Sequence, residues 1–159
     1  MSAHAEIRDD APGGPAARAL FAEYMELVRT RLGLPEDMVP PERIFATEDV
    51  FSGRGGAWLV AFDEAGEPVG CGGLRVLSPG VGEVKRMFVS GRARRTGVGR
   101  RLLRELERRA AADGLTHVRL LTTEVLSEAR VLYAAEGYRE IGRSQPPEGP
   151  IEVWLEKAL

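Results

Sequence analysis

Apolar residues recur at helical spacing in three segments of the chain. In "AARALFAEYMELVRTRLG" they lie three or four residues apart, which predicts an amphipathic helix that ends at Gly33. A second helix is predicted for "GVGRRLLRELERRAAADG", which ends at Gly114. A third is predicted for "SEARVLYAAEG", with Ser127 as the N-cap and Gly137 directly after the helix. The apolar face of the second helix comprises Val98, Leu102, Leu103, Leu106 and Ala110.

Apolar runs bounded by turns predict strands between and after these helices. "AWLVAFD", "PVGCGGLRVL" and "VGEVKRMFV" are separated by the turns "EAGE" and "SPG", which indicates an antiparallel meander. "THVRLLTT" stands between the second and third helices, and "YREIGR" and "IEVWLEK" come after the third. The predicted fold class is therefore α/β (α+β), with a single mixed, mainly antiparallel sheet flanked by helices.

The length of the chain, 159 residues, is typical of one domain. We expect residues 15–159 to form this domain. The preceding stretch "MSAHAEIRDDAPGG" is polar, contains Gly and Pro, and lacks the hydrophobic segment of a signal peptide, so we expect residues 1–14 to be a flexible extension. No apolar run approaches the roughly 20 residues of a membrane span, so no membrane partner is expected.

Residue types that several kinds of catalysis need are scarce. Cys71 is the only cysteine and lies in an apolar run, so we interpret it as an inert buried thiol rather than a nucleophile. His4 and His117, the only histidines, lie far apart in the sequence and have no triad motif around them. This composition excludes an internal disulfide, fits a cytoplasmic setting, and contains no metal-ligand spacing, so no metal ion is expected.

The net charge is only -2, but basic residues concentrate in one segment. Ten of the 22 lie between Lys85 and Arg109, and five of these surround two glycines in "RARRTGVGRR". The stretch follows a predicted strand and begins a predicted helix, whose free backbone N–H groups attract anions. It therefore predicts a phosphate or pyrophosphate site. The alternatives are a solvated arginine face and a nucleic-acid surface, although the run has no aromatic side chains for base stacking.

Two motifs, in order, resemble those of the GNAT family of N-acetyltransferases. The family signature Q/R-x-x-G-x-G/A is met by "RRTGVG", residues 94–99, after a strand and at the start of a helix. Some thirty residues further on, "ARVLYAAEGY" is similar to the second motif, A-x-x-L-Y followed by G-F/Y. The resemblance covers about residues 56–157. It implies a GNAT-like acyl-CoA N-acyltransferase fold, with acetyl-CoA as the co-substrate.

The resemblance assigns the contacts of acetyl-CoA to two segments. The backbone of Met87, Phe88 and Val89 is expected to pair with the pantetheine arm like an added strand, and a backbone N–H there to polarise the acetyl carbonyl. Many family members carry Asn or Gln where this chain has Leu126, and Ser127 is the expected substitute for that contact. The residues expected around the pyrophosphate are Arg94, Arg95, Thr96, Gly97, Val98, Gly99 and Arg100.

The resemblance also supplies two candidate catalytic side chains. Glu83, eleven residues before Arg94, is the candidate general base that removes a proton from the acceptor amine. The alternative is a carboxylate paired with an arginine. Tyr133 is the candidate general acid that protonates the departing thiolate, and the alternative is a core tyrosine on an amphipathic helix.

The alternation of side chains along a strand predicts which neighbours of Glu83 share its face. Residues 83, 85 and 87 are expected on one face, and residues 84, 86 and 88 on the other. Lys85 and Arg86 then point in opposite directions, so that one of them reaches the acceptor pocket or forms a structural ion pair.

Three functions are compatible with this sequence. The favoured one is an N-acetyltransferase that acts on a primary amine of a small molecule or protein by direct attack in a ternary complex. The alternative is a non-catalytic acyl-CoA-binding or sensing domain, and a nucleic-acid-binding module is disfavoured by the net charge. The acceptor is expected to be selected by the first helix, the loop 34–56 and the last hairpin. A homodimer is a common arrangement in the family.

Overall fold

The computed structural model describes residues 4–37, 49–147 and 149–159. Its helices are α1 (Pro15–Leu32), α3 (Val98–Ala112) and α4 (Ser127–Ala135), and η2 (Gly91–Ala93) is a short 3-10 turn. Its strands are β1 (Glu6–Asp9), β2 (Ala57–Phe62), β3 (Pro68–Ser78), β4 (Val81–Val89), β5 (His117–Thr123), β6 (Arg139–Ser144) and β7 (Glu152–Ala158).

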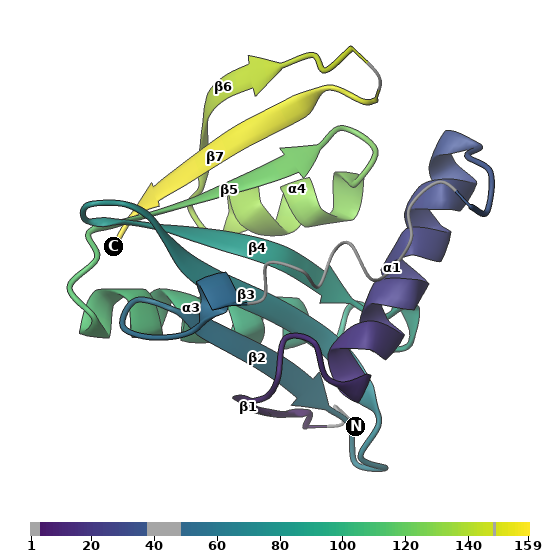
Figure 1. Ribbon diagram of the computed structural model, residues 1–159, viewed down its shortest axis with the longest axis horizontal. Coiled ribbons are helices and arrows are strands. Elements are labelled where there is room, and N and C mark those ends of the chain that lie inside the picture. The colour runs from purple at the N-terminus through teal and green to yellow at the C-terminus, as the bar shows by residue number, and fades with distance from the viewer. Residues whose placement is uncertain (1–3, 38–48, 148) are drawn as a thin grey trace.

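The strands of the described chain form one mixed sheet in the order β1-β2-β3-β4-β5-β7-β6 (Figure 1). Strands β4 and β5 run parallel, and the other neighbouring pairs run antiparallel. The parallel pair needs a long crossover, and η2 with α3 provides it. The predicted fold class is confirmed, including the mainly antiparallel sheet and the three helices that flank it.

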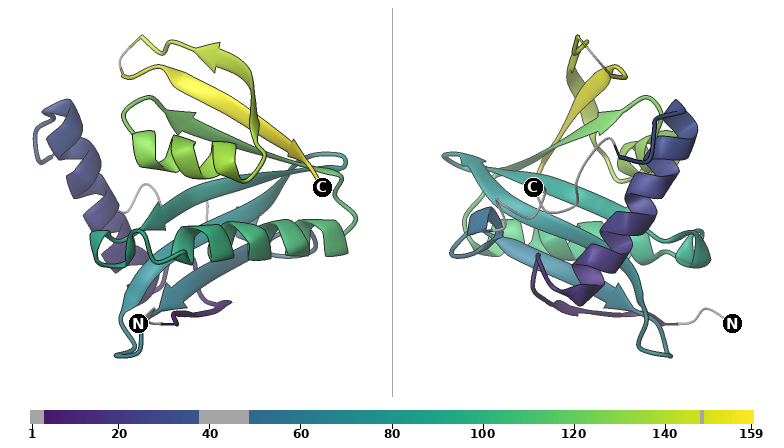
Figure 2. Two further views of the ribbon diagram at one scale, coloured as in Figure 1. Left: turned by 180° about the vertical axis from the view of Figure 1, so that it is seen from behind. Right: turned by 45° about the vertical axis from the view of Figure 1, so that its right-hand side comes forward.

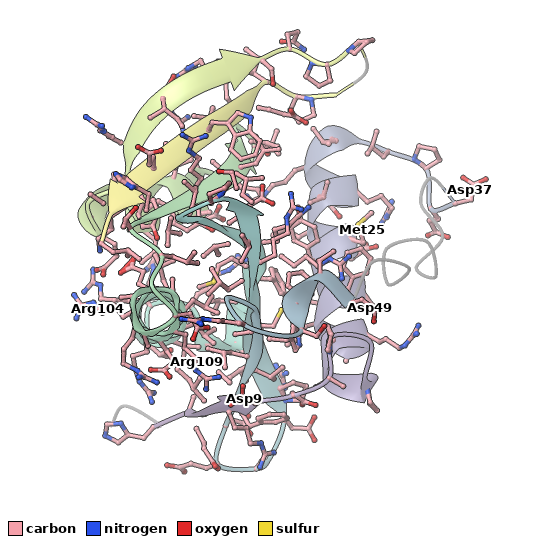
Figure 3. The ribbon with its side chains drawn as sticks, turned by 60° about the vertical axis from the view of Figure 1, so that its left-hand side comes forward. Asp9, Met25, Asp37, Asp49, Arg104 and Arg109 are labelled. Carbon is pink, nitrogen blue, oxygen red and sulfur yellow. The ribbon has the colours of Figure 1, made fainter. Side chains whose placement is uncertain are left out.

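The expected flexible extension over residues 1–14 is wrong in its middle part. Glu6–Asp9 form β1, which pairs with β2 at the edge of the sheet. The edge strand is also tied to α3, because Arg109 donates to both oxygens of Asp9 at 2.6 and 2.7 Å (Figure 3). No strand was predicted here because "EIRD" has a single apolar residue, Ile7.

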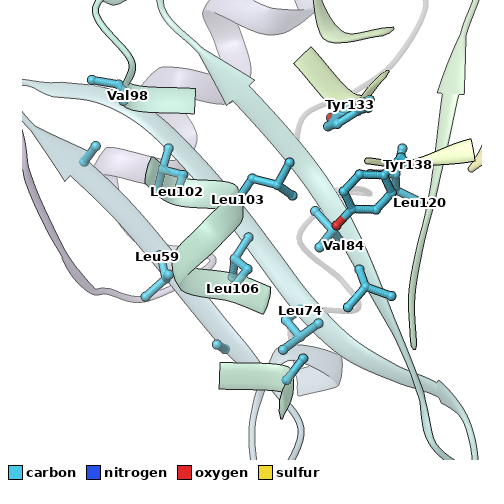
Figure 4. Packing of buried hydrophobic residues seen from close by; sticks show 14 of the residues in the cluster. Leu59, Leu74, Val84, Val98, Leu102, Leu103, Leu106, Leu120, Tyr133 and Tyr138 are labelled. Carbon is cyan, nitrogen blue, oxygen red and sulfur yellow. The ribbon is translucent and has the colours of Figure 1, made fainter. Parts of the chain in front are cut away.

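Helices α3 and α4 cover one face of the sheet (Figure 2). The predicted apolar face of α3 is buried in full, and its leucines pack on Leu59, Leu74 and Val84 of the strands (Figure 4). Tyr133 of α4 and Tyr138, which precedes β6, belong to the same cluster. The main core therefore fastens the crossover helix to the centre of the sheet.

Helix α1 covers the opposite face and has a smaller core. Leu20 packs there with Trp58, Val60 and Phe88. The helix ends at Gly33, whose φ of 64° is left-handed, as the sequence predicted. The face of the sheet beneath α1 is rich in aromatic side chains.

A bulge in β4 changes which residues share a face. Cys71 of β3 pairs with Phe88 and Gly73 pairs with Lys85, so β4 contains one extra residue between them. Arg86 there has a φ of 54°, which costs a non-glycine residue about 1–2 kcal/mol. The predicted strict alternation of residues 83–88 is therefore wrong, since Val84 packs on the α3 side whereas Phe88 packs on the α1 side.

Three predictions concern the termini of α3 and α4, and two of them are confirmed. Gly114 and Gly137 follow α3 and α4 with φ values of 85° and 92°. Ser127, however, is not the N-cap of α4: it is the first helical residue, and Leu126 is the N-cap, without a side-chain hydrogen bond. The preceding turn fixes this start, because the Leu126 N–H donates to the Thr123 carbonyl at 3.2 Å.

Candidate active site

The two parallel strands diverge halfway along their length. The β4–β5 ladder runs from Val81 and His117 to Val84 and Leu120 and then stops (Figure 1). Beyond this point β4 still pairs with β3, and β5 still pairs with β7. The edges of β4 and β5 that face each other are thus open in the middle of the sheet, and an extended chain can hydrogen-bond to such an edge.

A cavity of about 170 Å³ lies at this opening. Val84 and Met87 of β4 and Leu120 of β5 line its middle. Its wall also includes Tyr133 of α4, which covers one face of the sheet, and Tyr24 of α1, which covers the other. The cavity therefore connects the two faces through the gap between the strands.

Tyr133 lies in the wall of this cavity and is 4% exposed. Its ring packs at an angle against that of Tyr138, with 5.9 Å between the ring centroids. Burial raises the pKa of the Tyr133 hydroxyl, and the nearby Tyr24 raises it further. The hydroxyl therefore stays protonated throughout the neutral range, as a general acid requires.

Tyr24 is a site residue that the sequence indicated only as an apolar helix position. It lines the cavity, packs edge-on against Phe88 with the ring centroids 5.6 Å apart, and has a pKa raised by burial. Helical spacing alone does not distinguish a core tyrosine from one that faces a cavity. The distinction depends on the divergence of β4 and β5, which no local pattern encodes.

Glu83 is 3% exposed and is held by a cation. The Arg75 Nε donates to its Oε1 at 2.6 Å, and the Lys85 Nζ lies 3.9 Å from the same oxygen. Glu83 lies beside the opening, next to Val84, but does not itself line the cavity. This geometry matches the alternative of an arginine-paired carboxylate. A proton transfer from the cavity to Glu83 would pass through an intervening water.

Glu83 also belongs to a row of alternating charges across five strands. Arg75, Glu83, Arg119, Glu156 and Arg139 occupy neighbouring register positions on β3, β4, β5, β7 and β6. The Arg119 Nε donates to the Glu156 Oε2 at 2.6 Å, so the row contains a second close pair. Such cross-strand pairs of opposite charge stabilise the register of a sheet.

The start of α3 has the properties of an anion site. Gly97 is its N-cap with a φ of 85°, no side chain caps it, and its first turn has no acidic residue. The first-turn N–H groups are therefore free to bind a ligand. A Cβ on Gly99 would come within 3.2 Å of the Leu132 and Val89 side chains, so a larger residue here would require both side chains to shift slightly. These residues fit the pyrophosphate of a coenzyme.

Most arginines around this helix start have partners inside the protein. Arg100 lies 2.7 Å from Glu136, and Arg101 donates to the Ala5 carbonyl at 2.8 Å. Arg94 lies 3.8 Å from Glu128, whose pKa is lowered to about 2, chiefly by its hydrogen bonds with Arg31. The free backbone of the turn, rather than its arginines, is thus the main attraction for an anion.

Only some of the other residues expected to contact acetyl-CoA or the acceptor lie at the cavity. Met87 and Phe88 line the cavity, and Val89 packs beside it on the α3 side. Ser127 is exposed and does not line the cavity, so the structure does not bring it to the other site residues. Residues 38–48 of the expected acceptor loop lie outside the described residues.

Lys85 and Arg86 do not point to opposite faces, contrary to the prediction. The bulge turns both toward the α1 side, where Lys85 approaches Glu83 and the Arg86 guanidinium lies 5.4 Å from the centre of the Phe51 ring. Arg86 lines the cavity, whereas Lys85 does not. Arg86 is therefore the cation of this pair that faces the acceptor region.

Cys71 is 4% exposed, and burial raises the pKa of its thiol to about 12. It is therefore almost entirely protonated at neutral pH and a poor nucleophile, as predicted. Among the described residues, no group of three or more His, Cys, Asp or Glu side chains is arranged to hold a metal ion. No described helix is long and apolar enough to cross a membrane.

The sheet with its diverging central parallel pair is the fold of GNAT acyl-CoA N-acyltransferases. A family model described as "Acetyltransferase (GNAT) family" matches residues 17–138. The chain belongs to this family, since the match covers well over half of it.

Individual relatives agree with this assignment. An IAA acetyltransferase of Azospirillum brasilense is 41% identical over 99 residues, which are 60% of this chain and 63% of that protein. The matched part of the chain thus spans less than two thirds of this curated relative. A GNAT-family acetyltransferase from Staphylococcus aureus has a TM-score of 0.78 at 18% identity, covering 98% of this chain and 99% of that one.

A phosphinothricin acetyltransferase from Sinorhizobium meliloti, solved in complex with AcCoA, has a TM-score of 0.72 at 20% identity. The match covers 100% of this chain and 89% of the phosphinothricin acetyltransferase chain. At such identities the two solved structures establish only the fold.

Proposed function

We propose that this protein transfers the acetyl group of acetyl-CoA to a primary amine, by direct attack within a ternary complex. The observation that carries the proposal is the cavity at the divergence of β4 and β5, which is accessible to groups from both faces of the sheet. The coenzyme approaches along the α3 and α4 side and the acceptor along the α1 side. The two reactants then meet in the gap between the strands.

The start of α3 binds the pyrophosphate in this proposal. Its support is the glycine N-cap, the absence of an acidic residue from the first turn, and the close packing at Gly99. The binding groups are the backbone N–H groups of residues 95–100, apart from that of Thr96, which already donates to the Ala93 carbonyl at 3.4 Å. The side chains of Arg94 and Arg95 add positive charge. Membership of the GNAT family also supports acetyl-CoA as the coenzyme.

The open edge of β4 binds the pantetheine arm. Residues 87–89 follow the last pair of the β4–β5 ladder, so their edge toward β5 has no partner strand in the described part of the chain. A backbone N–H at the bulge, near Met87 or Phe88, then donates to the acetyl carbonyl. Such a donor stabilises the negative charge that develops on this oxygen during attack.

Glu83 and Tyr133 carry the two proton transfers. A primary amine is mostly protonated at neutral pH, so a base must remove a proton before attack. Glu83 accepts it through a water molecule, because its carboxylate lies beside the cavity rather than in its wall. Tyr133 donates its hydroxyl proton to the departing thiolate, a role supported by its place in the cavity wall.

The binding half of this proposal is tested by thermal unfolding with and without acetyl-CoA. A ligand present at about 100 times its Kd raises the melting temperature of a domain of this size by roughly 5–10 °C. The catalytic half is tested by thiol release from acetyl-CoA in the presence of primary amines. Absence of any thermal shift at millimolar acetyl-CoA would contradict the proposal.

Replacement of Tyr133 distinguishes an enzyme from a domain that only binds acyl-CoA. We expect Tyr133→Phe to lower kcat by about 10²-fold, because a general acid typically contributes at least this factor, with little change in the thermal shift. Tyr138→Phe is the control, since Tyr138 packs in the core but does not line the cavity. Full activity of the Tyr133 variant would remove the residue from the mechanism.

A further inference from the structure

The cavity extends beyond the opening between β4 and β5, into the layer between α1 and the sheet. Ala17, Leu20, Phe21 and Tyr24 of α1 form one wall of this part. Trp58 of β2, Cys71 of β3 and Phe88 of β4 form the other. The proposed acetyl transfer brings the acceptor in along this side but does not say which group of the acceptor lies in this inner part.

The inner part is apolar and largely aromatic. The rings of Phe21 and Tyr24 lie 6.0 Å apart, and that of Phe88 packs edge-on against Tyr24. Walls of this kind favour a flat apolar group, because aromatic pairs gain from edge and offset contacts. The whole cavity, including the opening between the strands, has a volume of about 170 Å³. An apolar cavity of about 150 Å³ in another protein takes up benzene, so one six-membered ring would fill most of this cavity.

Trp58, which lines the cavity, also contains a buried polar atom. The residue is 4% exposed, and its indole Nε1 has no hydrogen-bond partner in the described part of the chain. An indole nitrogen only donates, and buried donors are almost always paired. A ligand atom that accepts this hydrogen bond would complete the site.

Charge narrows the chemistry further. Arg86 faces the cavity, and none of the described residues that line the cavity has an acidic side chain. Among these residues a second positive charge on the acceptor has no counter-ion, and burial of an unpaired charge is strongly unfavourable. A neutral acceptor atom on the ring, such as a hydroxyl or ether oxygen, satisfies the indole N–H without this cost.

We infer that the acceptor is a small arylalkylamine: its ring, carrying an oxygen acceptor, lies between α1 and the sheet against Trp58, and its amine reaches the opening between β4 and β5. This inference rests on the proposed function for the direction of the amine. The seating of the ring depends only on the cavity, so binding can be measured apart from turnover.

The test compares four primary amines by calorimetric titration. Tyramine has the ring and a hydroxyl, phenethylamine has the ring alone, hexylamine has neither, and cadaverine has a second charge. We expect tyramine to bind most tightly, with a Kd about 3- to 10-fold below that of phenethylamine, as one hydrogen bond provides. Tighter binding of hexylamine or cadaverine than of the ring-bearing amines would overturn the inference.

Variants locate the binding. Trp58→Phe keeps an aromatic ring but lacks the N–H, so the advantage of tyramine over phenethylamine should disappear. Trp154→Phe replaces the other tryptophan, which does not line the cavity, and should leave that advantage intact. Ala17→Leu narrows the cavity and should weaken both ring-bearing amines by more than 10-fold, with thermal unfolding as the check that each variant folds. An unchanged preference in Trp58→Phe overturns the inference.

The same panel separates this inference from the proposed function. Binding of tyramine without thiol release contradicts acetyl transfer but supports the seating of the ring. Thiol release with hexylamine or cadaverine and none with tyramine supports acetyl transfer but overturns the inference. A third outcome would also overturn the inference. If the protein uses hexanoyl-CoA in preference to acetyl-CoA, and Ala17→Leu abolishes this preference, the cavity holds the acyl chain rather than the ring of the acceptor.

Discussion

Arg86 shows how one residue can redirect a strand. Its left-handed φ of 54° inserts the extra residue of the β4 bulge, and the side chains after it change faces. Met87 then packs on the α3 side and Phe88 on the α1 side. Strained residues of this kind concentrate at functional sites, and this one lies where the two central strands diverge.

Glu83 and Glu156 allow a matched test of the proposed base. Both pair with an arginine of the same charge row at 2.6 Å, but only Glu83 lies next to the cavity. We expect Glu83→Gln to lower kcat by about 10²-fold with little change in acetyl-CoA affinity, because only the proton transfer is lost. Steady-state kinetics measures this.

Glu156→Gln is the control for the loss of one carboxylate from the row, and it should leave kcat within twofold of the parent protein. Equal losses of kcat in both variants would mean that the row only stabilises the sheet. Wild-type turnover in Glu83→Gln across the pH range would exclude Glu83 as the base.

The start of α3 matters through its backbone. Gly97→Ala forces an alanine into a left-handed conformation with a φ of 85°, which costs about 1–2 kcal/mol of stability. Space is not the cause, because a Cβ on Gly97 would meet no atom within 4 Å. We expect a lower free energy of unfolding in urea and a reduced thermal shift with acetyl-CoA.

Gly91→Ala is the matched control in the same loop region, since its Cβ would also be free of contacts and its φ is not positive. It should change neither the free energy of unfolding nor the thermal shift. A Gly97 variant as stable as this control would contradict the strain argument.

Local sequence patterns predicted most helices and strands, but they missed strand β1 and the bulge in β4. The apolar spacing of α3 and the runs of β2 to β5 were sufficient, because each element buries a whole stripe or run of side chains. Strand β1 was missed because its residues derive their place from pairing with β2. The bulge was missed because its left-handed position is occupied by Arg86. A glycine there would have indicated a bulge, since glycine adopts a positive φ without strain.

The candidate site was likewise predictable only where a local pattern marks its residues. Gly97 and Gly99 were recognisable because their positions after a strand and at a helix start are encoded locally. Tyr24, Trp58 and Arg86 were not, since they converge from three separate elements. Their meeting depends on the packing of α1 across the sheet, which the spacing of apolar residues does not specify.

At the scale of the whole molecule, the short β4–β5 ladder joins two parts of the sheet. Other links span the same boundary: Glu136, at the end of α4, binds Arg100 and Arg104 of α3 at 2.7 and 2.8 Å. Glu107 of α3 accepts hydrogen bonds from Tyr138 and Lys157 at 2.9 Å each. These side chains hold the two parts together on the α3 face, where the strands themselves have separated.

The link through Glu136 predicts a pH dependence of stability. Its hydrogen bond with Arg104 lowers the pKa of the Glu136 carboxyl below the ordinary value of 4.5. A carboxyl whose pKa is lowered by folding stabilises the protein above its ordinary pKa, and this contribution is lost as the pH falls through the lowered value. Glu136→Gln should therefore lower the melting temperature by a few degrees near neutral pH, with the difference closing below about pH 4.

Glu140→Gln provides the comparison for that measurement. Glu140 also has a lowered pKa, from its hydrogen bonds with Arg143, but both residues lie on the exposed strand β6 and do not link the two parts. Its replacement should change the melting temperature little at any pH, because exposed pairs contribute little. A pH-independent effect of Glu136→Gln would show that the charge of this link is irrelevant.

The passage through the sheet has a consequence for the order of events. In the proposed reaction the coenzyme lies on the α4 face and the amine on the α1 face, so the two products would leave in opposite directions. Because the β4–β5 ladder ends after four residue pairs, the seven-stranded sheet of the described chain would provide a separate exit for each product of the proposed reaction.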